Sequence, residues 1–425
     1  MAVSHRQTLT FLLSLLVLLT AGCQSFPPLL NAGREPQIGP IHRHPDGDVI
    51  GRLATLQLQP GDTLADVARY FDIGLQAIQD ANPGIDPWAP EAGREILLPL
   101  AFLLPDAPRE GIVVNLAAMR LFHFSAGEPQ TVATYPVGIG RAGWNTPTGR
   151  TRIVEKIAHP RWVVPESIRR EHARKGDPLP KIVPPGPENP LGNHALRLGW
   201  RSYLIHGTNK PYGVGLRISH GCIRLYPEDI ARLFSRVGEG TPVTIVDQPY
   251  LLGWRGKELL LEIHRPLSQD PRTLSALWRD LERRLRQAQT QTGRPIDWRR
   301  VDRAVAEARG IPLPVLADAP RWADYLASLP RVSHPARWRY AYQPPPLQPG
   351  WYLVLKPRPL LESRIVTAIL RHQGPPYPAR FLEGRVVVGP YPEKSHARRA
   401  QRRLAQELEL ESRLLPPAAL AASRR

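Results

Sequence analysis

A cysteine and two histidines stand in an order that suits nucleophilic catalysis. His206 precedes the run Ser219-His220-Gly221-Cys222, and Cys23 is the only other cysteine in the chain. A thiol is only a few per cent ionised at neutral pH, and a nearby imidazole that takes its proton makes it a stronger nucleophile. These residue types therefore predict acyl transfer by Cys222, with His206 as the general base.

The residues around Cys222 supply the other parts of such a site. Acyl transfer needs donors for a developing oxyanion, and the backbone N–H groups of Gly221 and Cys222 are candidates because glycine lets the backbone approach closely. Arg224 is suited to hold a substrate carboxylate through two parallel hydrogen bonds. We predict that Ser219 and Arg224 bind substrate, and that His220 acts beside them in the catalytic centre.

Three alternatives remain open for these residues. In the first alternative, Cys222 is a buried core residue and the two histidines are ordinary strand residues. In the second alternative, a zinc ion with one open position is bound by His206, His220 and Cys222. His220 and Cys222 are only two residues apart on one strand, which is an awkward spacing for two ligands. An NlpC-type endopeptidase is the third, but there the cysteine precedes its histidines, the reverse of the order here. We expect no metal and no cofactor.

Two stretches, Ile205-His206-Gly207-Thr208 and Ser219 to Leu225, resemble the signature of the YkuD-type L,D-transpeptidases. Thr146 to Gly149 also matches the usual surroundings of that signature. The resemblance covers residues 111–247 and implies a mainly-β catalytic domain. Arg224 stands where many members have asparagine, and this version of the motif resembles the ErfK/YbiS-like lipoprotein subgroup of Gram-negative bacteria.

The resemblance also implies a reaction on peptidoglycan. Cys222 would attack the bond after the third residue of a tetrapeptide stem, release D-alanine and hold the stem as a thioester, with the carbonyl of Gly207 orienting His206. A diaminopimelate amine as acceptor gives a 3-3 cross-link, the lysine of a Braun-type lipoprotein ties the wall to the membrane, and water gives an L,D-carboxypeptidase. Carbapenems imitate the acyl donor and acylate members of this family.

The N-terminus has the features of a lipoprotein signal peptide. The apolar run Phe11 to Leu19 is too short to span a bilayer as a helix, and it leads into Thr20-Ala21-Gly22-Cys23. This end resembles a lipobox, although Thr20 stands where leucine is more usual. The resemblance implies an acylated Cys23 and, because Gln24 is not an aspartate, sorting to the outer membrane.

The predicted signal peptide covers residues 1–22, and residues 23–58 are predicted to form a mobile tether because they are rich in proline, glycine, histidine and polar residues. We therefore expect a periplasmic protein anchored by lipid. If Cys23 is acylated, Cys222 is left as a single thiol that cannot form an intramolecular disulfide.

Residues 59–100 predict a small βααβ module. Thr63 and Asp66 form a capping-box pattern. One helical face then carries Leu64, Val67, Ala68 and Phe71, and a second short helix precedes Asn82-Pro83-Gly84 and a strand at Glu95 to Leu98. These features resemble a LysM module, which implies binding to N-acetylglucosamine polymers.

The regions after the LysM-like module differ in their periodicity. Strand patterns dominate residues 111–247, with one helix from Pro227 to Val237. Leucines at helical spacing from Leu274 to Leu285 predict that residues 266–346 form a helical connector that ends in a Pro-rich spacer.

Residues 347–416 predict an α+β domain. Its expected elements are a strand at Trp351 to Leu355, a helix near Glu362 to Arg371, a strand at Arg385 to Tyr391 and a basic helix at Ser395 to Leu408. This order resembles a SPOR domain, a module that binds glycan strands lacking stem peptides. Two wall-binding modules also leave open a peptidoglycan-binding scaffold with an idle catalytic centre, against which the intact His206 and Cys222 argue.

The charge of the chain favours anionic partners. Lys and Arg number 56 against 38 Asp and Glu, a net charge of +18. No zinc-finger spacing, Lys-rich tail or RNP-type aromatic motif accompanies this charge, so we expect no nucleic acid. The sequence as a whole predicts a multidomain enzyme whose partner is peptidoglycan, both its stem peptides and its glycan strands.

Overall fold

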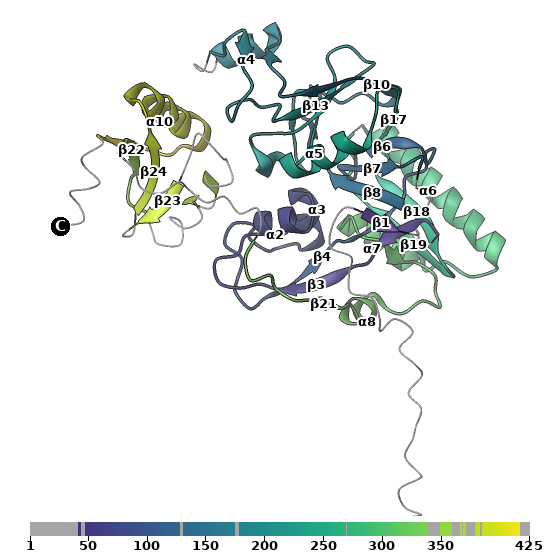
Figure 1. The fold of residues 1–425 in the computed structure, drawn as a ribbon. Helices are drawn as coiled ribbons and strands as arrows, with labels where there is room; N and C mark the ends of the chain where they lie inside the picture. Colours follow the sequence, from purple (N-terminus) through teal and green to yellow (C-terminus); the bar gives the residue numbers. More distant parts are fainter. Residues whose placement is uncertain are drawn as a thin grey trace, which may run out of the picture. The chain divides into compact units, whose positions relative to one another are not determined.

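The structure is a computed structural model (Figure 1) that describes residues 41–43, 47–127, 131–174, 178–268, 270–338, 349–358, 366–367, 369–370, 379–382 and 385–416. The predicted signal peptide and Cys23 lie outside these residues. Within the described part of the chain, no helix is both long enough and apolar enough to cross a membrane.

The βααβ module is present, but its first strand lies before the predicted start at residue 59, within the segment predicted to be a tether. It consists of β3 (Ala54–Gln57), α2 (Leu64–Tyr70), α3 (Leu75–Ala81) and β4 (Glu95–Leu98), and β3 pairs antiparallel with β4. The backbone N–H of Asp66 donates to Thr63 Oγ1 at 3.0 Å, which caps α2. The buried side chains of α2 and α3 pack with those of the two strands into one apolar core.

A nine-stranded sheet forms the centre of the catalytic region, in the order β1-β8-β7-β6-β17-β10-β13-β14-β16. These strands are β1 (Ile41–Arg43), β6 (Gly111–Asn115), β7 (Arg120–Phe124), β8 (Thr131–Pro136), β10 (Gly149–Ala158), β13 (His194–Leu198), β14 (Leu204–His206), β16 (Ile223–Arg224) and β17 (Pro242–Val246). The helix α5 (Pro227–Arg236) buries Ile230 and Leu233 against this sheet. The mainly-β character predicted for residues 111–247 is therefore present.

Shorter elements complete this region around the sheet. β9 (Ile139–Gly140) pairs in parallel with β15 (Arg217–Ser219), and a 3-10 turn, η1 (Pro211–Gly213), precedes β15. Between β10 and β13 the chain forms β11 (Trp162–Val163), α4 (Glu166–Arg174) and β12 (Ile182–Val183), of which the two strands pair with each other.

The prediction of a mobile tether over residues 23–58 is wrong for its described part. β1 adds to the edge of the large sheet, where Ile41, His42 and Arg43 pair with Ala133, Val132 and Thr131 of β8. β2 (Val49–Gly51) pairs with β5 (Ala101–Leu103). These strands depend on partners about 50 to 90 residues away in the chain, which composition does not reveal.

The description of residues 266–346 as a helical connector was incomplete. The helices α6 (Pro271–Thr292) and α7 (Trp298–Glu307) are present, and α8 (Trp322–Ala327) follows them. The chain also contains β18 (Tyr250–Arg255), β19 (Glu258–Ile263), β20 (Leu313–Pro314) and β21 (Arg331–Val332). β18, β19 and β20 form a sheet that shares an apolar core with α6 and α7, and β21 pairs with β3 of the βααβ module. The same core also contains Leu53, Ala81, Leu97 and Ala101, so this region is packed against the βααβ module rather than separate from it.

The C-terminal region forms a separate sheet in the order β23-β24-β22-β25. Its strands are β22 (Trp351–Leu355), β23 (Ala379–Leu382), β24 (Arg385–Tyr391) and β25 (Ser412–Leu415), and α10 (Lys394–Leu408) packs on them. β22, β24 and α10 match predicted elements, whereas β23 and β25 were not predicted. The helix expected near Glu362 to Arg371 lies mostly outside the described residues.

Candidate active site

His206 and Cys222 are brought together by the parallel pairing of β14 with β16. In this pair Ile205 lies opposite Ile223, and His206 lies opposite Arg224. Cys222 directly precedes β16, so the alternation of side chains along a strand places it on the same face as Arg224. His206 and Cys222 are therefore diagonal neighbours on one face of two adjacent strands.

The imidazole of His206 is held in one tautomer by the next residue. Its Nδ1 lies 2.6 Å from the carbonyl oxygen of Gly207, and because a carbonyl only accepts, Nδ1 carries the proton. Burial, and secondarily the charge of Arg224, lower the pKa of His206 to about 3. At neutral pH the imidazole is therefore neutral, with Nε2 as the basic atom, and the carbonyl of Gly207 makes the contact with the ring that the resemblance implies.

The thiol of Cys222 is also neutral in this environment. Its sulfur lies 3.8 Å from the carbonyl oxygen of Ser202, towards which the S–H donates. Burial raises the pKa of Cys222, and a backbone hydrogen bond from Leu204 offsets this only in part. Since burial disfavours both charged forms, the free enzyme holds a neutral thiol and a neutral imidazole rather than an ion pair.

The turn that carries Cys222 is fixed by Ser219 and Gly221. Ser219 Oγ donates to the carbonyl oxygen of Cys222 at 2.6 Å and accepts from the N–H of Gly221 at 3.2 Å. Gly221 has a φ of +101°, and a side chain there would meet the ring of Tyr203. The N–H of Gly221 is thus engaged within the turn, so its predicted role as an oxyanion donor requires that bond to be released. Ser219 shapes the turn, and its predicted contact with substrate stays a prediction.

Thr146 orients the peptide group that joins Gly221 to Cys222. Its Oγ1 donates to the carbonyl oxygen of Gly221 at 2.9 Å and accepts from the N–H of Gly140 at 3.1 Å. Because the carbonyl and the N–H of a trans peptide point to opposite sides, the N–H of Cys222 is directed away from Thr146. Sequence reasoning noticed Thr146 only as part of a motif and gave it no role.

Arg224 places a half-buried cation beside the candidate catalytic pair. Its Nε is buried and has no hydrogen-bond partner among the described residues. Burial lowers the pKa of its guanidinium, whereas Tyr212 and Cys222 act to raise it. Binding of a substrate carboxylate by Arg224 stays a prediction from its residue type.

His220 contacts Glu171, Arg141 and Trp144, none of which is a hydrogen-bond partner of Cys222. Its Nε2 lies 3.1 Å from Glu171 Oε2 and 3.2 Å from Arg141 Nη2, and its ring stacks edge-on against Trp144 at 4.8 Å. Burial lowers the pKa of His220, which Glu171 partly offsets. Glu171 and Arg141 lie outside the signature motif, and sequence reasoning did not identify them.

The zinc alternative gains no support from this arrangement, because Nε2 of His220 faces Glu171 and Arg141. Among the residues that the structure describes, no three His, Cys, Asp or Glu side chains are grouped so that they could hold a metal ion.

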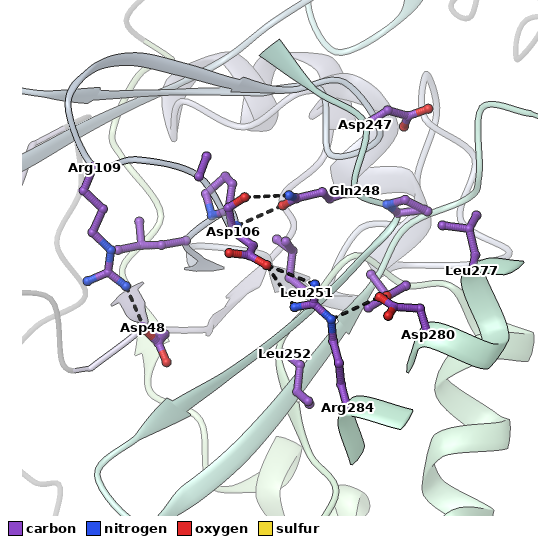
Figure 2. Close-up of a pocket in the computed structure, with 15 residues that line it drawn as sticks. Asp48, Asp106, Arg109, Asp247, Gln248, Leu251, Leu252, Leu277, Asp280 and Arg284 are labelled. Carbon is purple, nitrogen blue, oxygen red and sulfur yellow. Dashed lines mark hydrogen bonds and ion pairs between the residues drawn. The ribbon is translucent and has the colours of Figure 1, made fainter. Parts of the chain in front are cut away.

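A cavity of about 450 Å³ lies elsewhere, lined by residues of the β5–β6 and β17–β18 connections, β18 and α6 (Figure 2). Most of its charged groups are already paired, Asp247 being the exception among the described residues that line it. Arg284 contacts Asp106 at 3.0 Å and Asp280 at 3.1 Å, and Arg109 contacts Asp48 at 2.7 Å. None of the predicted catalytic residues lines this cavity, so the candidate chemistry remains at Cys222.

Two family models match the chain. The L,D-transpeptidase catalytic domain, YkuD, matches residues 109–245, and the LysM domain matches residues 57–99.

Curated relatives match half of the chain or more. "Probable L,D-transpeptidase YcfS" of Escherichia coli is 44% identical over 223 residues, which cover 50% of this chain and 69% of the relative. "Probable L,D-transpeptidase ErfK/SrfK" of Salmonella typhimurium is 43% identical over 231 residues, 53% of this chain and 74% of the relative. "Probable L,D-transpeptidase YbiS" of Escherichia coli is 38% identical over 274 residues, 62% of this chain and 88% of the relative. The chain belongs to the YkuD family of L,D-transpeptidases and carries a LysM domain together with its catalytic domain.

Proposed function

We propose that this L,D-transpeptidase works through a thioester on Cys222. The sulfur attacks the carbonyl carbon of the bond between the third residue and D-alanine in a tetrapeptide stem, and the thiol proton passes to Nε2 of His206. The carbon–nitrogen bond breaks, and the departing amine of D-alanine takes that proton. An acceptor amine then attacks the thioester, gives a proton to His206 and forms the new amide as the thiol is restored.

The observation that carries this proposal is the contact between Nδ1 of His206 and the carbonyl oxygen of Gly207. A neutral imidazole whose Nδ1–H is bonded to Gly207 at 2.6 Å presents Nε2 as an acceptor. The turn held by Ser219 and Thr146 keeps Cys222 on the same face of the sheet. The N–H of Cys222, directed away from Thr146, is the backbone donor best placed to stabilise the oxyanion.

Arg224 supports the choice of an acidic substrate. A guanidinium whose buried Nε has no partner is costly unless a ligand supplies an acceptor. Stem peptides that contain diaminopimelate carry carboxylates, which satisfy this requirement. We therefore assign Arg224 to a carboxylate of the acyl donor.

Mass spectrometry of the products identifies the reaction and its acceptor. Purified protein is incubated with tetrapeptide muropeptides, with and without a peptide that ends in the lysine of a Braun-type lipoprotein. A 3-3 dimer or a lysine-linked stem, each lost in Cys222→Ser, supports the proposal. Tripeptides alone, again dependent on Cys222, indicate an L,D-carboxypeptidase, and unchanged muropeptides indicate a peptidoglycan-binding scaffold.

We further propose that the protein is a periplasmic lipoprotein of the outer membrane, anchored through acylated Cys23. The support is the lipobox-like Thr20-Ala21-Gly22-Cys23 and Gln24 in the following position. Membrane extraction of wild type and Cys23→Ser tests this, because Cys23→Ser removes the acylated residue. More than one acyl chain is needed for stable membrane binding, since a single short chain binds only reversibly. Equal solubility of the two proteins contradicts the proposal.

The C-terminal domain is proposed to be a SPOR-like module that binds glycan. Its support is the VVVGPY strand β24 and the basic helix α10, which follow the expected order. Together with the LysM domain it would raise apparent affinity for sacculi through effective concentration. Removal of residues 347–416 should weaken sedimentation with sacculi, and unchanged sedimentation contradicts the role. Removal of 59–100 is a poor test, because β3 and β4 of that module share a sheet with β21.

A further inference from the structure

One carboxylate in the active-site region serves two donors at once. Glu171, on α4, accepts from Arg141 Nη2 at 2.6 Å and lies 3.1 Å from Nε2 of His220. The side chains of Arg141, Glu171 and His220 are 34%, 21% and 21% exposed, so solvent and solutes reach them. Arg141 and His220 could therefore hold the carboxylate of a ligand in the position that Glu171 occupies.

The two donors are fixed to the turn that carries the nucleophile. The N–H of Arg141 donates to the carbonyl oxygen of Ser219 at 3.0 Å, directly after β9 pairs with β15. His220 is separated from Cys222 by Gly221 alone, and the ring of Trp144 packs against its imidazole. The two donors are therefore attached to the turn that carries Cys222, whereas Glu171 lies on α4, between β10 and β13.

The chemistry of His220 allows an exchange of carboxylates. Nε2 of a neutral imidazole either donates or accepts, so it donates to Glu171 or accepts from Arg141, but not both. A second carboxylate that reached Arg141 would take over a charge-assisted bond and leave the guanidinium paired. The displaced Glu171 has a side chain that is 21% exposed, so water is able to solvate its carboxylate after the exchange.

We propose that Arg141 and His220 form a carboxylate-binding subsite for the stem peptide, which Glu171 occupies in the free enzyme. Arg141 is then a specificity-determining residue, and Glu171 is a positioning residue that competes with substrate. This inference rests on the proposed reaction of Cys222 with stem peptides. It assigns to Arg141 a carboxylate distinct from the one assigned to Arg224.

Calorimetry with full-length Cys222→Ser protein measures stem binding without chemistry. The ligands are the free tetrapeptide and two derivatives, one amidated at the terminal D-alanine and one amidated at the free diaminopimelate carboxyl. Arg141→Gln should weaken binding of the free tetrapeptide by about 10–100-fold, as expected for loss of a charge-assisted bond. Arg141→Gln should have little further effect on the derivative whose amidated group is the carboxylate that Arg141 binds. The derivative that is insensitive to the substitution therefore identifies that carboxylate.

Glu171→Gln gives the sharper result, because it should tighten binding of the tetrapeptide by about 3–10-fold through removal of the competing charge. A purely structural role for Glu171 predicts the opposite direction. Arg150→Gln on β10 and Glu166→Gln on α4 make the same charge changes at exposed positions and should leave affinity unchanged.

Two outcomes overturn the inference. One is weaker binding in Glu171→Gln. The other is that Arg141→Gln leaves peptide affinity unchanged, or weakens it equally for all three peptides. Failure of the proposed reaction is a separate result, seen as the absence of a carbapenem adduct on Cys222 in the protein that keeps its thiol.

Discussion

His206 and Arg224 are register partners across the parallel β14–β16 pair, so the imidazole of His206 has a half-buried cation directly beside it. Burial lowers the pKa of His206 most, and Arg224 lowers it further, to about 3. A base with this pKa stays deprotonated over the whole range in which an ordinary histidine, with a pKa of 6.5, would become charged.

The pH dependence of acylation should reflect this pair. His206 accepts a proton only in its neutral form, so the acid limb of the rate of carbapenem acylation should lie well below pH 6.5. Arg224→Met removes the neighbouring charge, which should raise the pKa of His206 and move the acid limb to higher pH. Stopped-flow acylation rates across pH measure both, with far-UV circular dichroism to confirm folding. A wild-type acid limb at pH 6.5 or above contradicts the assignment.

Substitutions of the three motif residues should have unequal effects on carbapenem acylation. Cys222→Ser should lose the adduct, because a hydroxyl is far less acidic than a thiol. His206→Ala should slow adduct formation by about 10²–10⁴-fold, the range for loss of a general base. His220→Ala should slow it less, since His220 faces Glu171 and Arg141. Intact-mass spectrometry follows the adduct. A folded His206→Ala protein that reacts at the wild-type rate while His220→Ala does not would reverse the two roles.

Thr146 offers a test of backbone orientation. Thr146→Val keeps the shape of the side chain but removes the hydroxyl that bonds Gly221 and Gly140. We expect acylation to slow by about 10–100-fold, less than the loss of a whole oxyanion donor. Thr146→Ser restores the hydroxyl and should recover most of the rate. If the serine variant is as slow as the valine variant, packing of the methyl group rather than the hydrogen bond matters.

Arg69 of the LysM domain and Glu228 of α5 form a two-point ion pair, at 2.9 Å and 3.0 Å. Their side chains are only 20% and 13% exposed, so each single alanine substitution should reduce the free energy of unfolding by about 1–3 kcal/mol. The double variant should lose less than the sum of the two.

Urea denaturation of these variants measures the coupling. The exposed pair Glu166 and Arg170, at 3.9 Å, serves as a control and should couple by less than about 0.5 kcal/mol. Additive losses for Arg69 and Glu228 would show that the contact does not join the LysM domain to the catalytic domain energetically.

The sequence by itself determined the nature of the two matched domains and which residues are the catalytic candidates. Cys222 and His206 were predicted because nucleophilic chemistry demands particular residue types in a particular order, which a sequence displays directly. The LysM helices were found for a similar reason, since the cap at Thr63 and Asp66 and the apolar face of α2 are local features.

The tertiary structure alone decided which distant residues complete the site. Glu171 lies 49 residues before His220, and Thr146 lies 75 residues before Gly221, yet each forms a hydrogen bond there. β1 and β21 were missed because each is a strand of only three or two residues whose partner is remote in the chain. The neutral state of Cys222 and His206 also depended on burial, a property of the folded chain. Residue type sets what a side chain is able to do, whereas its partners and its charge depend on which long-range contacts the fold creates.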